Sequence, residues 1–246
     1  MLWIYLSPHF DDAALSCGGL VWEQVRAGDS VSIWTVCAGE PPATELSPFA
    51  QELHARWEAG DDAPSQRKVE DLNSCQRLGA ASRYFDIPDC IYRRHPGTGR
   101  FLYASEAALS GPVQPGDDQT IARLREELGR AYQPGMNLVC PLAIGNHVDH
   151  QLTRLVLEGM RRSLWYYADY PYVEQGRVQV EELERAGWVS QHFSISQAGL
   201  LAWQDSIAAH ASQISTFWRG ETEMRQAIAA YLGGNNGFRL WRRPQA

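Results

Sequence analysis

The chain has 246 residues, 44% of them hydrophobic, which is enough apolar sequence for a substantial core. Its formal net charge of −7, with no lysine- or arginine-rich block, argues against nucleic acid or an anionic membrane surface as the main partner. No stretch approaches the roughly 20 apolar residues that span a bilayer, and the N-terminus lacks a signal-peptide pattern, so we expect a cytoplasmic protein.

The first two thirds of the chain alternate between predicted strands and predicted helices. The strands are short apolar runs, and the helices between them show apolar residues on one side. This alternation predicts an α/β fold, namely a Rossmann-like, mostly parallel sheet with helices on both faces. In chain order, the expected elements are a strand at 2–7, a helix at about 12–27, a strand at 31–37, a helix at about 65–79, a strand at 82–88, a helix near 117–132, a strand at 137–141 and a helix at 150–163.

Two parts of the chain are less regular. The segment from Tyr92 to Pro115 is rich in Gly, Pro and Arg, which is typical of a functional loop or lid, although a surface excursion without a role is the alternative. The aromatic run at 165–172 is interpreted as core and rim packing, with a sugar-stacking platform as the alternative. A long helix from Gln197 to about Trp218 and another over about 221–232 follow. With no boundary in evidence, we expect a single domain over residues 1–246.

Polar side chains gather where two of the predicted strands end. His9, Asp11 and Asp12 follow the first strand, and the segment 145–150, with the sequence Gly-Asn-His-Val-Asp-His, follows the strand at 137–141. Ligands of open parallel sheets bind outside the carboxyl ends of the strands, where helix N-termini also point. We therefore expect the two corners to meet in one crevice.

The residue types at the two corners favour a catalytic metal site. Zinc in hydrolases commonly has three protein ligands drawn from His, Asp and Glu, and His9, Asp12 and His150 supply such a set. Asp11 and His147 are then left for proton transfer. Either aspartate could instead cap the helix that follows, and two histidines with one carboxylate also form the iron site of non-haem oxygenases. Gly18 and Gly19 lack dinucleotide-binding spacing and are predicted to let the first helix pack closely on the sheet.

Three stretches carry a resemblance to a known family. Pro8 to Asp12, Cys17 to Gly19 and His147 to His150 resemble the PIG-L/LmbE-like family of zinc-dependent N-acetylglucosaminyl deacetylases in order and setting. The resemblance covers residues 1–160 well and the C-terminal part, 161–246, only loosely. It implies a deacetylase domain with its motif-bearing core in the first of these regions.

The resemblance also implies roles for individual residues. His9, Asp12 and His150 match the metal ligands of the family, and Asp11 matches its general base. A zinc-bound water would be the nucleophile in this reaction. Whether Asp11 or His147 protonates the leaving amine is left open.

The remaining matches concern the oxyanion and the substrate. His147 matches the histidine that supports the oxyanion, and Asp149 matches the carboxylate that orients and charges this histidine. Glu40, Arg67 and Asp89 fall where relatives contact sugar hydroxyls.

These implications lead to one predicted function and two alternatives. We expect a zinc-dependent N-deacetylase, a hydrolase of linear amide C–N bonds, that removes an N-acetyl or related N-acyl group from an amino sugar or its conjugate. The expected cofactor is Zn²⁺ or another divalent ion, and the expected partner is a small-molecule amino sugar, with no nucleic acid and no membrane span. A homo-oligomer is left open. The alternatives are a non-haem metal enzyme with a 2-His-1-carboxylate site and a non-catalytic sugar-binding relative.

Overall fold

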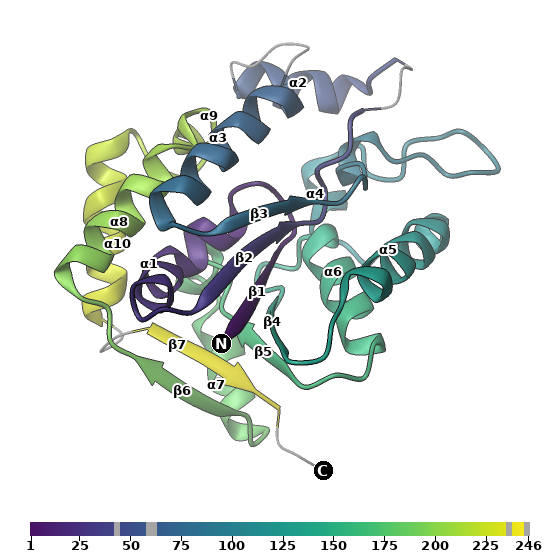
Figure 1. Ribbon diagram of the computed structural model, residues 1–246. Coiled ribbons are helices and arrows are strands. Elements are labelled where there is room, and N and C mark those ends of the chain that lie inside the picture. The colour runs from purple at the N-terminus through teal and green to yellow at the C-terminus, as the bar shows by residue number, and fades with distance from the viewer. Residues whose placement is uncertain (42–44, 58–62, 235–237, 244–246) are drawn as a thin grey trace.

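A computed structural model describes residues 1–41, 45–57, 63–234 and 238–243. Its centre is one seven-stranded sheet with the order β3-β2-β1-β4-β5-β7-β6 (Figure 1). The predicted α/β fold with a mostly parallel sheet is confirmed. The strands are β1 (Leu2–Ser7), β2 (Ser30–Thr35), β3 (Ala81–Tyr84), β4 (Met136–Pro141), β5 (Leu164–Tyr167), β6 (Val189–Phe193) and β7 (Phe238–Arg242).

Helices cover both faces of this sheet. Figure 1 shows α1, α3 and α8 grouped on one side, with α9 and α10 beside them, and α5 and α6 on the other side. The helix bounds are α1 (Asp12–Arg26), α2 (Pro48–Arg56), α3 (Ala63–Leu78), α4 (Glu106–Leu109), α5 (Asp118–Ala131), α6 (Val148–Gly159), α7 (Arg177–Arg185), α8 (Gln197–Ala208), α9 (Ala211–Phe217) and α10 (Glu221–Gly234).

The C-terminal part differs from expectation in two respects. The aromatic run after Leu164 begins with strand β5, which pairs in parallel with β4, while β7 and β6 continue the sheet as antiparallel strands. The long helix expected from Gln197 is interrupted, because α8 ends at Ala208 and α9 begins at Ala211, with His210 between them. Hydrophobic periodicity continues across this break, which is why the sequence pattern did not reveal it.

The strands that position the site are deeply buried. In β1 every residue from Trp3 to Ser7 is buried, and in β4 the run from Leu138 to Pro141 is buried. Strands covered by helices on both faces lose contact with water on both sides, so they carry continuous rather than alternating apolar runs. Because β1 and β4 are adjacent and parallel, their carboxyl ends lie at the same edge of the sheet.

Gly18 and Gly19 allow α1 to approach α8 closely. A Cβ atom at Gly18 would lie 2.5 Å from Cδ1 of Trp203, and one at Gly19 would lie 2.9 Å from Cε3 of the same ring. The indole Nε1 of Trp203 donates a hydrogen bond to the carbonyl oxygen of Ala14 at 2.8 Å, which fixes the ring against the helix. The close packing expected for these glycines is present, but it is against α8 and not against the sheet.

This contact leads to a stability prediction for Gly18→Ala. We expect a loss of about 1–3 kcal/mol in the free energy of unfolding, because the added methyl group has no room beside a hydrogen-bonded, fully buried indole. Gly129→Ala is the matched control, since a Cβ atom there meets nothing within 4 Å and alanine favours α5 by about 0.5–1 kcal/mol. Urea unfolding of both variants tests this prediction, and equal stabilities would contradict it.

The buried carboxyl group of Asp71 makes stability depend on pH. It lies in α3, where the hydroxyl group of Tyr84 donates to it at 2.7 Å. Burial raises the pKa of Asp71 to about 7 despite this hydrogen bond, whereas an unfolded aspartate titrates near ~3.9. Between these pH values the folded state binds more protons than the unfolded state, so its contribution to stability falls as pH rises.

We therefore expect the free energy of unfolding of Asp71→Asn, relative to that of the unmodified protein, to increase by about 2–3 kcal/mol from pH 5 to pH 8. The asparagine has no proton to lose over this range. Urea unfolding at both pH values measures this difference. Asp86→Asn, on an exposed side chain paired with Arg123, is the control. A difference for Asp71→Asn that does not change with pH would show that this carboxyl group is ionised in the folded state.

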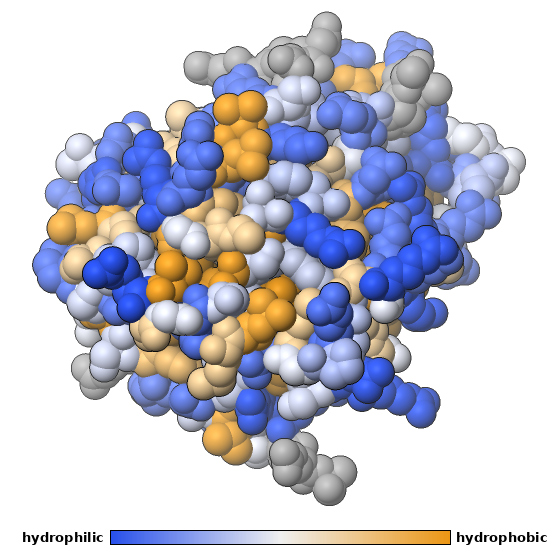
Figure 2. Space-filling view, viewed as in Figure 1, coloured by the Kyte–Doolittle hydropathy of each residue, from blue (hydrophilic) through white to orange (hydrophobic). Residues whose placement is uncertain are grey.

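The surface is mixed in character. Figure 2 shows hydrophilic residues over much of one face, interrupted by smaller hydrophobic areas. Large exposed apolar side chains include Val69 and Leu72 of α3 and Leu201 of α8. Among the described residues, none of the helices has the length and apolar character needed to cross a membrane.

Candidate active site

The first corner is the tight connection between β1 and α1. The hydroxyl group of Ser7 donates to the carbonyl oxygen of His9 at 2.6 Å and accepts from the amide of Ala13 at 2.9 Å, so it satisfies a free amide of the first helical turn. Asp12 accepts the backbone amide of His9 at 2.7 Å. Asp11 is the N-cap residue of α1 but makes no side-chain capping hydrogen bond. The turn is closed without Asp11, whose carboxylate is left for other contacts.

The second corner is the connection between β4 and α6. Ala143, Gly145 and Asn146 have φ values of 58°, 89° and 59°, in the left-handed region. Such values are uncommon for alanine and cost conformational energy, which folded proteins tolerate mainly at functional sites. This backbone course brings His147 to the N-cap position of α6 and His150 into its first turn.

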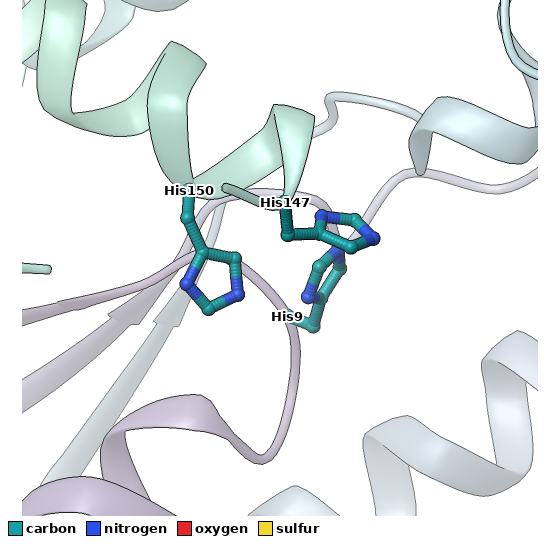
Figure 3. A group of neighbouring side chains, drawn as sticks. All are labelled: His9, His147 and His150. Atoms are coloured by element: carbon teal, nitrogen blue, oxygen red, sulfur yellow. The ribbon is translucent and has the colours of Figure 1, made fainter. Parts of the chain in front are cut away.

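The histidines of the two corners converge (Figure 3). The ring centroids of His9 and His147 are 4.8 Å apart, and those of His9 and His150 are 5.5 Å apart. One nitrogen from each of the three rings lies within 4.8 Å of the other two. The expected meeting of two distant segments in one crevice is therefore present.

Asp12 lies between two of these rings. One carboxylate oxygen is 3.0 Å from Nδ1 of His9, and the other is 3.2 Å from Nε2 of His150. The structure thus brings together all three residues predicted as metal ligands, and all three are buried. A carboxylate and two imidazoles from separate elements are a donor set that suits zinc and related divalent ions.

The outer nitrogens of the two imidazoles also face carboxylates. Nε2 of His9 is 3.0 Å from Asp149, and Nδ1 of His150 is 2.7 Å from Asp169. Asp169 also accepts the backbone amide of Ile144 at 2.9 Å, which anchors it to the second corner. A carboxylate that holds the outer nitrogen of a ligating histidine is a recurrent feature of metal sites.

Asp169 is a site residue that the sequence analysis missed. It follows β5 closely, at the same edge of the sheet as the two corners, and its side chain is buried. The available signal is an acidic residue soon after a strand, but the interpretation of the aromatic run around it, as packing or as a sugar-stacking platform, gives this aspartate no role.

The charges at this point favour a bound cation. Burial lowers the pKa of His150, but Asp12 and a hydrogen bond with Asp169 outweigh it and raise this pKa to about 10. His9 behaves in the same way: burial lowers its pKa, while Asp12 and Asp149 raise it well above its ordinary value. Burial also opposes ionisation of Asp12, yet the two imidazoles keep its pKa well below its usual range. A divalent ion would supply the positive charge that protons otherwise provide here.

Asp149 contacts His147 through its backbone amide, while its carboxylate has other partners. The carboxylate of Asp149 faces His9 and Arg93, and Nδ1 of His147 accepts the backbone amide of Asp149 at 3.3 Å. Burial and the neighbouring His9 lower the pKa of His147 to about 3, although Asp149 acts in the opposite direction. The role of Asp149 in orienting and charging His147 stays a prediction, and the guanidinium group of Arg93 and the ring of His9 are further partners of its carboxylate.

Of the three residues predicted to contact the substrate, two line the cavity at the histidines and one does not. Arg67 lies 3.5 Å from Asp11 and 4.0 Å from Asp89, and all three line the same cavity as the histidines. Glu40 is exposed and is absent from the described residues that line this cavity.

The cavity beside the histidines has a volume of about 210 Å³. Trp57, Tyr172 and Phe217 form aromatic parts of its wall, and Glu106 of α4 adds a carboxylate. The ring of Trp57 stacks under the guanidinium group of Arg67 at 4.7 Å. Aromatic faces beside charged and hydroxyl-bearing groups are suited to the alternating apolar and polar surfaces of a sugar.

Both the sequence and the fold are similar to those of known deacetylases. The sequence is similar to a 2'-N-acetylparomamine deacetylase of Niallia circulans, with 29% identity over 213 residues, covering 75% of this chain and 71% of the relative. A 2'-N-acetylparomamine deacetylase of Streptomyces fradiae is 27% identical over 185 residues, covering 70% of this chain and 58% of that relative.

The fold is similar to that of teicoplanin deacetylase in its zinc-inhibited form, with a TM-score of 0.78, 23% identity and 100% of both chains covered. The sequence profile of the PIG-L family, described as GlcNAc-PI de-N-acetylase, matches residues 4–160 and so includes both corners of the site. Since this match spans more than half of the sequence, the chain belongs to the PIG-L family.

Proposed function

We propose that this protein is a metal-dependent deacetylase that removes an acetyl group from the nitrogen of an amino sugar. The observation that carries the proposal is the position of Asp12, whose two oxygens contact imidazoles from segments about 140 residues apart. We further propose that His9, Asp12 and His150 hold the metal ion, with Zn²⁺ as the ion, and that residues 1–246 form one domain.

Besides the cluster of His9, His147 and His150, two other donor sets lie nearby. Cys37 approaches His9 and Asp149, and Cys90 approaches His147 and Asp149, with ligand atoms within 4.8 Å of one another in each set. Burial raises the pKa of both thiols, and a neutral thiol is a poor metal ligand. Asp149 is in addition paired with Arg93 at 2.5 Å. These features favour the set built on Asp12.

A divalent ion at this position would supply Lewis acidity, which activates water and polarises an amide carbonyl. Asp11 is proposed as the general base, because its carboxylate lines the cavity and is not used in capping α1. It would accept a proton from the attacking water and is one candidate to return it to the nitrogen as the C–N bond breaks. The amine then leaves in neutral form.

His147 is proposed to donate a hydrogen bond to the developing oxyanion. Because Nδ1 of its ring accepts a backbone amide, the neutral imidazole carries its proton on Nε2. A low pKa keeps this ring neutral at physiological pH. A neutral donor in a buried site stabilises negative charge without being ionised itself.

The substrate is proposed to be an N-acetylated amino sugar within a larger conjugate. Both similar deacetylases act, by their names, on N-acetylparomamine, and the structural neighbour is a teicoplanin deacetylase. Arg67 and Asp89 are the proposed contacts to sugar hydroxyl groups, since both line the cavity. Glu40 would reach the substrate only if the conjugate extended beyond the crevice.

The test is a screen of N-acetylated amino sugars and their conjugates for release of acetate and a primary amine, with and without a chelator. We expect release from at least one compound, loss of release with the chelator and recovery with Zn²⁺. Turnover that requires dioxygen would support the oxygenase alternative. Binding of sugars without any acetate release would support the non-catalytic alternative.

A further inference from the structure

A buried arginine links the irregular segment after Tyr92 to the histidine cluster. One guanidinium nitrogen of Arg93 lies 2.5 Å from Asp149, and its Nε lies 3.1 Å from Asp117. The exposed fractions of these side chains are 3% for the arginine and 0% for both aspartates. The predicted function makes no use of this ion-pair network.

The network continues into the segment itself. The hydroxyl group of Tyr103 donates to Asp117 at 2.7 Å and accepts the backbone amide of Gln114 at 2.8 Å. The guanidinium group of Arg93 also lies 5.3 Å from the centre of the Tyr103 ring. Tyr103 and Asp117 therefore both contact Arg93 and fix the orientation of its guanidinium group.

The two imidazoles that face Asp12 are held in different ways. Asp169, which holds His150, is anchored by a backbone amide. Asp149, which holds His9, accepts the backbone amide of Cys90 at 3.1 Å and is also paired with the guanidinium group of Arg93. Of these two arrangements, only the second pairs the carboxylate with a buried guanidinium group.

Stability alone is a weak explanation for such a pair. Removing ions from water costs several kcal/mol for each ion, and apolar residues of similar volume are often at least as stabilising. Burial lowers the pKa of Arg93, but Asp149 outweighs it and keeps the group charged. The charge therefore persists in the core, next to a carboxylate whose other oxygen contacts His9.

We propose that Arg93 is a positioning residue that holds the Asp149 carboxylate against Nε2 of His9 and so leaves Nδ1 of this ring facing Asp12. Asp117 and Tyr103 keep the guanidinium group in place. The segment from Tyr92 to Pro115, together with Asp117, is thus an outer support of the metal site as well as part of the cavity wall. This inference rests on the proposed metal ligands of the preceding subsection.

Zinc affinity tests the proposal without a substrate. We would compare the unmodified protein with Arg93→Lys, Arg93→Met and Asp117→Asn by competition with a chromophoric chelator. Arg93→Lys keeps the charge but cannot serve both carboxylates in the same geometry. We expect affinity to fall by about 10–100-fold in Arg93→Met and less in Arg93→Lys and Asp117→Asn, the range typical when a residue that holds a ligand is lost.

Arg94→Lys is the matched control. Arg94 lies in the same segment, but its guanidinium group bonds the carbonyl oxygens of Gly99 and Glu45 and lies 3.7 Å from the centre of the Phe101 ring. We expect its zinc affinity to equal that of the unmodified protein. Thermal unfolding of the metal-free proteins separates loss of positioning from loss of folding. If Arg93→Met does not fold, Arg93→Lys and Asp117→Asn still decide the question.

The outcomes distinguish this inference from the proposed function. Folded Arg93 and Asp117 variants with unchanged zinc affinity would overturn the positioning role alone. An unmodified protein that binds no zinc would overturn both. A protein that binds zinc with the expected order of affinities but releases no acetate would retain the positioning role and lose the proposed function.

Discussion

Asp11→Asn is expected to lower the rate of acetate release by about 10²–10⁴-fold, the usual contribution of a general base. The asparagine keeps the size of the side chain but cannot take a proton from water. Zinc content should remain unchanged, because the two imidazoles contact Asp12 and not Asp11. The Arg67 partner of Asp11 also remains, so the cavity should keep its shape.

Acetate release and zinc content should be measured on the same preparation of this variant. Asp86→Asn is a matched control, since it removes one aspartate charge at an exposed ion pair with Arg123. It should retain full activity. Asp11→Asn with normal zinc content and normal acetate release would remove Asp11 from the reaction, whereas loss of zinc would instead assign it to metal binding.

His150→Ala is expected to abolish stoichiometric zinc binding. Its imidazole contacts Asp12 at 3.2 Å and is buried, so its removal leaves a cavity and takes away one of three proposed ligands. Asp169→Asn should have a smaller effect, about 10–100-fold in affinity, because Asp169 only holds the outer nitrogen of this imidazole. The expected order of zinc affinity is the unmodified protein, then Asp169→Asn, then His150→Ala.

His192→Ala is the control for these two variants. His192 is an exposed residue of the edge strand β6, which lies at the far end of the sheet from β1. Its loss should leave zinc affinity unchanged. Dialysis against a zinc buffer followed by elemental analysis gives the zinc content of the unmodified protein and the three variants. Full zinc occupancy in His150→Ala would exclude this histidine as a ligand.

Much of the sheet around the site could be predicted from sequence. The apolar runs of β1, β2 and β4 are local signals, and strands joined by helical crossovers pair in parallel. Because parallel strands present their carboxyl ends at one edge, the two polar corners could be expected to meet without knowledge of any contact. The convergence of His9, His147 and His150 follows from this topology.

The contacts outside the predicted ligand set could not be predicted from the sequence. Asp169 is held by His150 and by a backbone amide of another loop, and both contacts depend on the register of β5 against β4. Arg93 reaches Asp149 and Asp117 from an irregular segment without hydrophobic periodicity. Such pairs are decided by tertiary packing, so local patterns do not reveal them.

The same reason explains why the partners of the Asp149 carboxylate could not be predicted. Its position one residue before His150 and two after His147 suggested an interaction within the turn, but its side chain points to His9 and Arg93. The antiparallel pairing of β6 and β7 depends likewise on contacts between distant segments. Sequence patterns identified the residues that meet in the crevice. The partners of each carboxylate became known only from the folded structure.

Anomalous diffraction at the zinc absorption edge, from crystals of the zinc-loaded protein, would locate the metal ion directly. We expect one strong peak next to Nδ1 of His9, Nε2 of His150 and the carboxylate of Asp12, at distances of about 2.0–2.2 Å. A peak bonded to Cys37 or Cys90, or one that leaves Asp12 uncoordinated, would contradict this expectation.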